Sequence, residues 1–133
     1  MVIDASVWVS TFVIKDAHHQ TSRNWLHERL VNSARMTTPT LVLSEVAGAV
    51  ARRTGMPELG QRAAEEILRT PLLSLIAPDE QLGKVAAHLA ATLRLRGADA
   101  VYVAVALTLN MPLITWDQEL LDRAGRMIQV TRP

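Results

Sequence analysis

The sequence predicts a single α/β domain in which helices flank a central parallel sheet. Three observations lead to this prediction. Short apolar runs alternate with longer segments of helical periodicity, which is typical of a layered α/β architecture. The length of 133 residues suits one domain, and no repeat of roughly 20 to 50 residues indicates a solenoid. We therefore expect one domain over residues 1–133.

The first part of the chain is expected to form a strand and two helices. An apolar strand at residues 1–3 ends at Asp4. Ser6 is expected to cap the helix that follows, because a serine hydroxyl accepts from the free N–H groups of a first turn. Apolar residues recur at helical spacing over 18–34, which predicts an amphipathic helix, and residues 36–38 are expected to be extended.

The middle of the chain is expected to form two helices and one strand. Thr38 followed by Pro39 resembles a helix cap with proline at the first helical position, which opens a predicted helix that ends near Arg53. Another helix is expected over about 57–69 and a strand over 72–77.

The last part of the chain continues this alternation. Its expected elements are a helix at 79–95, a helix at 98–109, a strand at 112–115, a helix at 117–124 and a strand at 127–130. The helix at 98–109 is apolar on nearly every side, which indicates a buried helix. Asp99 is its one residue with a formal charge.

The composition excludes several classes of protein. A net charge of +1, from 14 Lys and Arg against 13 Asp and Glu, does not by itself indicate a nucleic-acid binder. The lack of cysteine excludes thiolate metal sites and disulfide frameworks, and it is compatible with a reducing cytoplasm. No signal peptide or spanning segment is recognised. The expectation is a cytoplasmic protein without a membrane segment.

Four carboxylates are candidates for one site. Asp4 and Asp117 each follow a short apolar strand, and parallel strands end at the same edge of a sheet. Asp99 opens a helix, and Glu45 lies beside the apolar stripe of another. We expect the four acids to converge at this edge.

Such a cluster indicates a metal site. Two carboxylates about 4 Å apart repel by about 4 kcal/mol at an effective dielectric of about 20, so a cation is needed to compensate. Oxygen ligands without cysteine or spaced histidines select Mg²⁺ or Mn²⁺. These ions activate water for phosphodiester hydrolysis. Ser6 and Thr115 are expected to support the site through their hydroxyls, and Glu119 or Asp122 is a possible fifth oxygen donor.

Each acid also has a structural explanation that requires no site. Asp99 stabilises the helix that it opens, Asp117 caps a short helix, and Asp4 satisfies a turn. Glu45 pairs with an arginine two turns further along its helix. Ser6 is equally explained as a simple helix cap.

Four segments contain the candidate acids: VIDASVW at 2–8, LSEV at 43–46, RGADAVYVAVA at 96–106 and LITWD at 113–117. Together they resemble the PIN-domain ribonucleases, and the set looks most like the single-domain VapC toxins. The resemblance extends from residue 2 to about 130 and keeps the family's order of Asp, Glu, Asp and Asp.

The resemblance implies a three-layer PIN-like fold with an acidic pocket that holds Mg²⁺ or Mn²⁺. Asp4 and Asp99 match the family's main metal ligands, and Glu45 and Asp117 match acids that bind directly or through water. Thr115 matches the family's supporting hydroxyl. The implied activity is metal-dependent endonucleolytic cleavage of single-stranded RNA, as the toxin of a toxin–antitoxin pair or as a PIN nuclease in RNA processing.

The resemblance also implies partners: a homodimer, and a small antitoxin that inserts a segment, often with an arginine, into the pocket. One departure from the family is Trp116, a bulky residue at a place that is often smaller. This puts access to the pocket in question, although an extended backbone would turn the Trp116 side chain away from Asp117.

Arginines near the acids are candidate contacts for RNA phosphates. Arg94 and Arg96 precede Asp99, and Arg52 and Arg53 follow Glu45 by two turns of helix. Solvated helix ends are the alternative explanation for these arginines. The few aromatic residues do not indicate a base-stacking platform. The histidines show no ligand spacing and are expected at the surface; they are His18, His19, His27 and His88.

Other classes with an acidic pocket fit less well. A phosphatase of the haloacid dehalogenase type needs a second aspartate two residues after Asp4, where this chain has Ser6. A response-regulator receiver needs a lysine after a late strand, and neither Lys15 nor Lys84 fits. A PIN-like fold used only for binding is disfavoured because all four acids are present.

Overall fold

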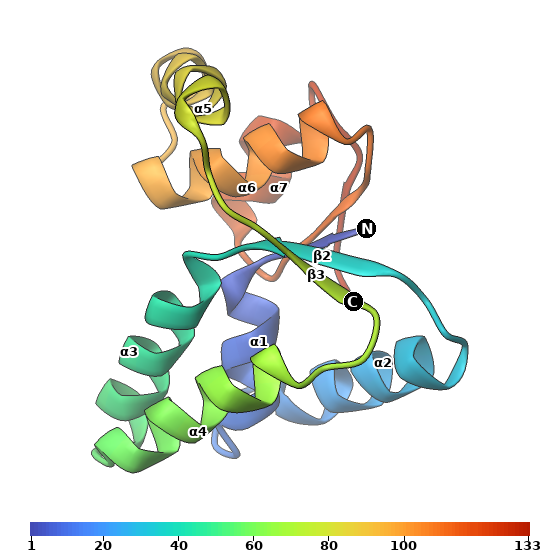
Figure 1. The fold of residues 1–133 in the computed structure, drawn as a ribbon, viewed down its shortest axis with the longest axis vertical. Helices are drawn as coiled ribbons and strands as arrows, with labels where there is room; N and C mark the ends of the chain where they lie inside the picture. Colours follow the sequence, from blue (N-terminus) through green and yellow to red (C-terminus); the bar gives the residue numbers. More distant parts are fainter.

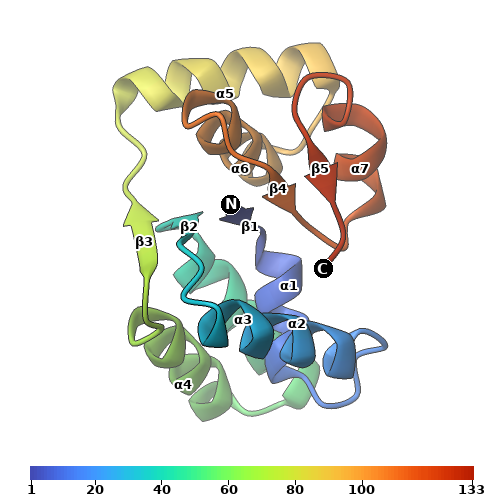
Figure 2. The same cartoon turned by 90° about the vertical axis from the view of Figure 1, so that its right-hand side faces the viewer.

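The computed structural model describes residues 1–133 as a three-layer α/β fold with a five-stranded parallel sheet. Figures 1 and 2 show the sheet between two groups of helices, α1 to α4 on one face and α5 to α7 on the other. The elements in chain order are β1 (Val2–Ile3), α1 (Ala5–Phe12), α2 (His19–Val31), β2 (Met36–Pro39), α3 (Val42–Thr54), α4 (Pro57–Leu68), β3 (Leu73–Ile76), α5 (Glu80–Leu93), α6 (Gly97–Thr108), β4 (Leu113–Ile114), α7 (Gln118–Ala124) and β5 (Val130–Thr131).

The order of the strands determines where a site can form. The order of strands in the sheet is β3-β2-β1-β4-β5. β2 and β3 are therefore added on one side of β1, and β4 and β5 on the other. Val2 pairs with Thr37 of β2 and with Leu113 of β4. In open parallel sheets, the crevice outside the strand ends at this reversal is the usual ligand site. Here it lies where β1 and β4 end.

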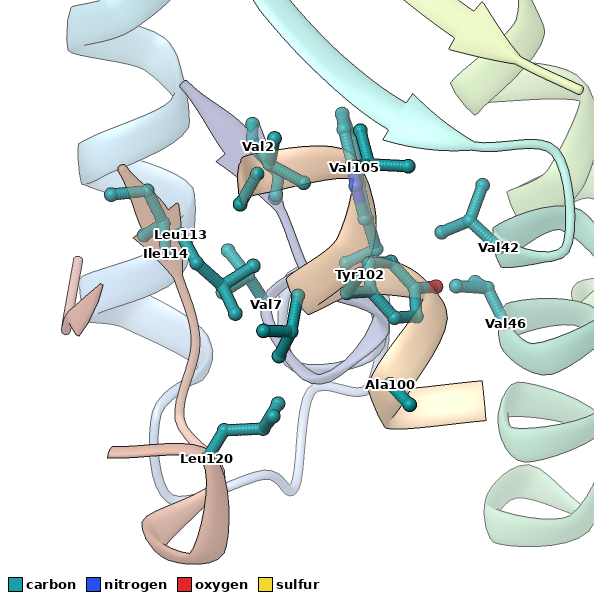
Figure 3. Close-up of a cluster of buried hydrophobic side chains, with 14 of the residues drawn as sticks. Val2, Val7, Val42, Val46, Ala100, Tyr102, Val105, Leu113, Ile114 and Leu120 are labelled. Atoms are coloured by element: carbon teal, nitrogen blue, oxygen red, sulfur yellow. The ribbon is translucent and has the colours of Figure 1, made fainter. Parts of the chain in front are cut away.

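The core is centred on α6, as its sequence predicts. Residues 102–106 of this helix are all buried, and α6 contacts β1, β2 and β4. Figure 3 shows side chains of other elements around it, including Val46 of α3, Ile114 of β4 and Leu120 of α7. Because α6 is held on several sides, its first turn is fixed relative to the ends of β1 and β4.

The cap of α1 differs from the expectation. Asp4, not Ser6, is the N-cap, and its carboxylate accepts from the Ser6 backbone N–H at 3.2 Å. Ser6 lies inside the first turn. The reason is that β1 ends at Ile3, so Asp4 is the extended residue between the strand and the helix.

The start of α3 also differs. Pro39 belongs to β2, where it is paired with Ile76 of β3, and α3 begins only at Val42. Thr38 caps nothing, because its hydroxyl donates to the Ile3 carbonyl at 2.9 Å. Pairing with two neighbouring strands extends β2 past the point where the local Thr-Pro pattern predicts a helix.

The remaining elements lie near their expected positions, with two further differences. The predicted helix at 18–34 is shorter, at 19–31, and Ser22 is its one fully buried residue. The last strand is not at 127–130 but at 130–131, because turns follow α7 as far as residue 127. None of the seven helices has the length and apolar character that a membrane span requires.

Candidate active site

The candidate site lies at the ends of β1 and β4, between α3 and α6. Asp4 directly follows β1, and Thr115 and Asp117 follow β4. Glu45 is in the first turn of α3 and Asp99 in the first turn of α6. The fold therefore brings the four predicted acids to one region from four separate elements.

Asp4 is the most buried of these acids, with 4% of its surface exposed. Its Oδ2 accepts from the hydroxyls of Ser6, at 2.5 Å, and Thr115, at 2.8 Å. Burial raises the pKa of Asp4, and these hydrogen bonds oppose the rise. Since all these donors meet Oδ2, the other carboxylate oxygen is left for a further partner.

Ser6 and Thr115 also fix the chain that leaves β4. The Ser6 hydroxyl accepts from the backbone N–H of Trp116 at 3.0 Å, and the Thr115 hydroxyl accepts from that of Asp117 at 2.9 Å. The two hydroxyls lie 3.3 Å apart. They thus hold the ends of β1 and β4 together around the Asp4 carboxylate.

Glu45 has a partner that was not expected from the sequence. The hydroxyl of Tyr102, from α6, donates to Glu45 Oε2 at 2.6 Å. Burial is the main cause that raises the pKa of Glu45, and the bond from Tyr102 opposes it. The alternative of an arginine partner is wrong, because Arg53 pairs with Asp16 and Arg52 forms no ion pair with Glu45. The available signal was that Tyr102 lies three residues after Asp99, on the same face of α6.

Asp99 is a largely buried acid whose one positive neighbour is Arg96. Burial, followed by the charge of Asp4, raises the pKa of Asp99 to about 6, although Arg96 opposes the shift. Its Oδ2 is buried and accepts no hydrogen bond, and the Nε of Arg96 lies 3.6 Å from it. A buried carboxylate oxygen without a hydrogen-bond donor is unfavourable unless a positive partner lies near it. Arg96 is that partner here, at a distance longer than a hydrogen bond.

Arg96 lies among the carboxylates. Its guanidinium is 3.6 Å from Asp99, 3.9 Å from Asp117 and 3.5 Å from Glu119. The charges of these acids raise the pKa of Arg96, with Asp99 the largest cause. Arg94 differs from Arg96: it ends α5 in a left-handed conformation, and its exposed side chain pairs with no acid. Of the two arginines, only Arg96 reaches the site.

Asp117 combines a structural role with a place at the site. Its Oδ1 caps α7 by accepting from the backbone N–H of Glu119 at 2.7 Å and that of Leu120 at 3.3 Å. Its Oδ2 is the oxygen near Arg96. Glu119 also reaches the site through Arg96, whereas Asp122 is exposed and accepts from Gln118. Of the two possible fifth acids, Glu119 is the one near the site.

The carboxylate oxygens of the four acids are ligands that a hard cation prefers, but the side chains are too far apart in this structure to bind one ion together. No group of three or more acidic or histidine side chains lies close enough to hold an ion. The charge of Asp4 nevertheless raises the pKa of both Glu45 and Asp99. An oxygen-only donor set, in which Asp99 Oδ2 accepts no hydrogen bond, suits Mg²⁺ or Mn²⁺. Binding one ion to three carboxylates requires these side chains to move closer together.

A cleft of about 380 Å³ opens beside the acids. Three residues of the site line it: Ser6, Glu45 and Asp117. The other polar residues that line it are Ser10, Asp16, His18, Arg52 and Arg53. The Trp116 side chain lines the cleft too, where its ring stacks on His18 and its Nε1 donates to Ser22, neither of which is hydrogen-bonded to Asp117. His18 is exposed, as expected, but it belongs to this wall. Trp116 therefore narrows one side of the cleft without filling it.

Comparison with known proteins identifies the family. The sequence profile of the PIN domain matches residues 1–126. The chain belongs to the PIN domain family. Membership supports a nuclease, and the expected three-layer PIN-like fold is confirmed. No curated protein matches the sequence.

Solved structures resemble this PIN domain over nearly its whole length. VapC20 from Mycobacterium tuberculosis, a sarcin-ricin loop cleaving toxin, is 22% identical with a TM-score of 0.75, covering 99% of this chain and 98% of VapC20. VapBC2 from Rickettsia felis, bound to a DNA fragment from its promoter, matches at 16% identity and TM-score 0.72, covering 98% and 96%. DNA-bound VapBC from Salmonella typhimurium matches at 17% identity and TM-score 0.71, also covering 98% and 96%. At these identities the likeness establishes the fold.

Proposed function

We propose that this PIN domain is a Mg²⁺- or Mn²⁺-dependent endoribonuclease that cleaves single-stranded RNA by phosphodiester hydrolysis. The observation that carries the proposal is Asp99, whose buried Oδ2 accepts no hydrogen bond and whose pKa is raised by burial and by the charge of Asp4. A carboxylate at the end of β1 and a second one in the first turn of α6 suit a hard cation and a phosphate at this edge of the parallel sheet.

Asp4 and Asp99 would hold the ion, with Glu45 and Asp117 as ligands directly or through water. When bound, a divalent ion supplies Lewis-acid activation of a water molecule and stabilises the charge on the phosphate. The attacking water loses a proton and forms a bond to phosphorus, while the bond from phosphorus to O3′ breaks and O3′ takes up a proton from solvent. The products are a 5′-phosphate and a 3′-hydroxyl.

The chain's own groups orient the acids for this reaction. Ser6 and Thr115 direct the Asp4 carboxylate by binding one of its oxygens. Tyr102 does the same for Glu45. Since burial raises the pKa of Glu45, its carboxylate is suited to accept a proton from the attacking water. Arg96 lies where it can neutralise the acids or contact a phosphate.

The proposed biological role is the toxin of a toxin–antitoxin pair in the cytoplasm. The support is the likeness to VapC20 and to VapBC complexes across nearly the full chain. An antitoxin and a second copy of this chain are the expected protein partners. An antitoxin that carries a cation to the acids would take over the contacts that Arg96 makes. Co-purification with the product of an adjacent reading frame tests this role.

The activity is tested with labelled single-stranded RNA oligonucleotides. Wild type is expected to cleave them with Mg²⁺ or Mn²⁺ and to stop when EDTA is added. Asp99→Asn is expected to abolish cleavage without loss of fold. Asp122→Asn is the matched control, because Asp122 is an exposed aspartate outside the site. Cleavage that continues in EDTA, or full activity of Asp99→Asn, overturns the proposal.

A further inference from the structure

We propose that the stacked rings of His18 and Trp116 form a platform for one base of the RNA substrate, next to the phosphate that is cleaved. The inference rests on the proposed nuclease function and assigns it a base-binding subsite. The sequence does not predict this platform, because the aromatic residues are few and the two rings are 98 positions apart in the chain. The fold brings them together on the wall of the acidic cleft.

Trp116 is held rigidly. Its indole Nε1 donates to the Ser22 hydroxyl at 2.8 Å, and its backbone N–H donates to Ser6 at 3.0 Å. Ser22 is fully buried and is itself bonded to the Ser10 hydroxyl at 2.7 Å. A ring fixed before binding loses little conformational freedom when a ligand stacks on it, which favours affinity.

His18 extends the indole toward solvent. The two ring centroids are 3.9 Å apart and the planes differ by 7°, so the rings are stacked face to face. The backbone N–H of His18 donates to Asp16 at 2.8 Å, which fixes the start of α2. Neither imidazole nitrogen has a hydrogen bond within the protein, and His18 is exposed. With one face on the indole, its other face is open for a third planar ring.

The same cleft supplies a positive charge for the RNA backbone. Arg53 is neutralised by its ion pair with Asp16, but Arg52 pairs with no acid. Arg52 lies against Gly48, where a Cβ would come within 3.0 Å of its Nη1. A flat ring platform combined with a free guanidinium is the usual arrangement for single-stranded nucleic acid. The volume of about 380 Å³ falls in the range of pockets that hold small ligands.

The platform is separated from catalysis by measuring binding without divalent ions. Fluorescence anisotropy in EDTA compares a labelled RNA that wild type cleaves with versions that lack one base at each position in turn. Wild type is expected to lose about tenfold in affinity when one particular base, next to the cleavage site, is absent. His18→Ala is expected to bind intact RNA about tenfold more weakly than wild type does. On the RNA that lacks this base, His18→Ala and wild type are expected to bind with equal affinity.

Two further variants complete the test. His18→Tyr keeps a planar ring and is expected to retain most of the affinity. His27→Ala removes an exposed histidine within α2 that is not part of the cleft, and this variant is expected to bind RNA as wild type does. Circular dichroism confirms the fold of each variant.

Different failures have different meanings. If wild type cleaves RNA but binds all abasic versions equally, the platform is wrong and the nuclease stands. The platform is also wrong if His18→Ala weakens the binding of intact and abasic RNA by the same factor. It is wrong as well if His18→Ala leaves RNA binding unchanged and weakens only the binding of a purified antitoxin. If wild type neither cleaves nor binds any RNA, the nuclease proposal fails first and the platform fails with it.

Discussion

Tyr102 and Glu45 are 57 positions apart, yet the tyrosine hydroxyl donates to the glutamate across the contact between α6 and α3 at 2.6 Å. Figure 3 shows the Tyr102 oxygen directed toward α3, beside Val46, while its ring lies in the core. A core residue of α6, Tyr102, therefore fixes the position of the Glu45 carboxylate on α3. Burial raises the pKa of Glu45, and this bond holds the rise in check.

Tyr102→Phe tests this relationship. The variant keeps the ring in the core and removes only the donor, so a loss of about 1 to 2 kcal/mol in the free energy of unfolding is expected. Loss of such a supporting bond is expected to lower kcat by about tenfold. In the Glu45→Gln background the same change is expected to have a smaller effect on kcat. Equal effects in both backgrounds would show that Tyr102 acts independently of Glu45.

The raised pKa of Asp99 predicts how stability depends on pH without divalent ions. The pKa rises from 3.8 to about 6 on folding, because burial and Asp4 disfavour the charged form. The folded state thus holds its proton more tightly than the unfolded state between these values, and stability falls as pH rises from about 4 through 6. In EDTA, Asp99→Asn is expected to have a higher melting temperature than wild type at pH 7.

The advantage of Asp99→Asn is expected to shrink at pH 4, where wild-type Asp99 is protonated. Asp122→Asn serves as the control for a general effect of lost negative charge. A lower melting temperature of Asp99→Asn at pH 7 would mean that its pairing with Arg96 outweighs burial and the charge of Asp4. Burial would then not be the dominant influence on the Asp99 carboxyl.

Arg96→Gln tests the competition between Arg96 and a divalent ion. The guanidinium lies 3.5 to 3.9 Å from oxygens of three acids, so its removal leaves their negative charge for a cation. The melting temperature of wild type is expected to rise with millimolar Mg²⁺ or Mn²⁺. Arg96→Gln is expected to reach the same rise at a several-fold lower concentration of the ion.

Arg94→Gln is the matched control for this measurement, because Arg94 is exposed and pairs with no acid. Equal metal responses of Arg96→Gln and wild type would mean that Arg96 does not compete with the ion. If Arg96→Gln binds the metal ion more tightly but RNA more weakly, Arg96 both neutralises the acids and contacts an RNA phosphate.

Replacing two different glycines with alanine is expected to change the free energy of unfolding in opposite directions. A Cβ at Gly60 would lie 2.3 Å from the Ala47 carbonyl oxygen, where α4 packs on α3. Gly60→Ala is therefore expected to lower the free energy of unfolding by about 1 to 3 kcal/mol. Gly83, inside α5, has nothing within 4 Å, and Gly83→Ala is expected to raise it by about 0.5 to 1 kcal/mol. Urea unfolding measures both; equal stabilities would contradict the close approach at Gly60.

Local pattern was sufficient to predict the elements and the acids, because both depend on residues near one another in the chain. The apolar run at 98–109 predicts the buried helix α6, and short strands before Asp4 and Asp117 predict acids at the sheet edge. The predicted start of a helix at Thr38 failed because a distant strand changed the local outcome. Pairing of Pro39 with Ile76 keeps the Thr-Pro pattern in β2.

The sequence by itself determined the alternation of strands and helices, the one buried helix and the types of residue available to a site, since periodicity and strand ends are local properties. Only the tertiary structure decided that Tyr102 supports Glu45, that Arg96 lies among three acids and that His18 stacks on Trp116. Each of these last contacts depends on strand order and helix packing. Both are fixed by burial of the whole core, which no single segment encodes.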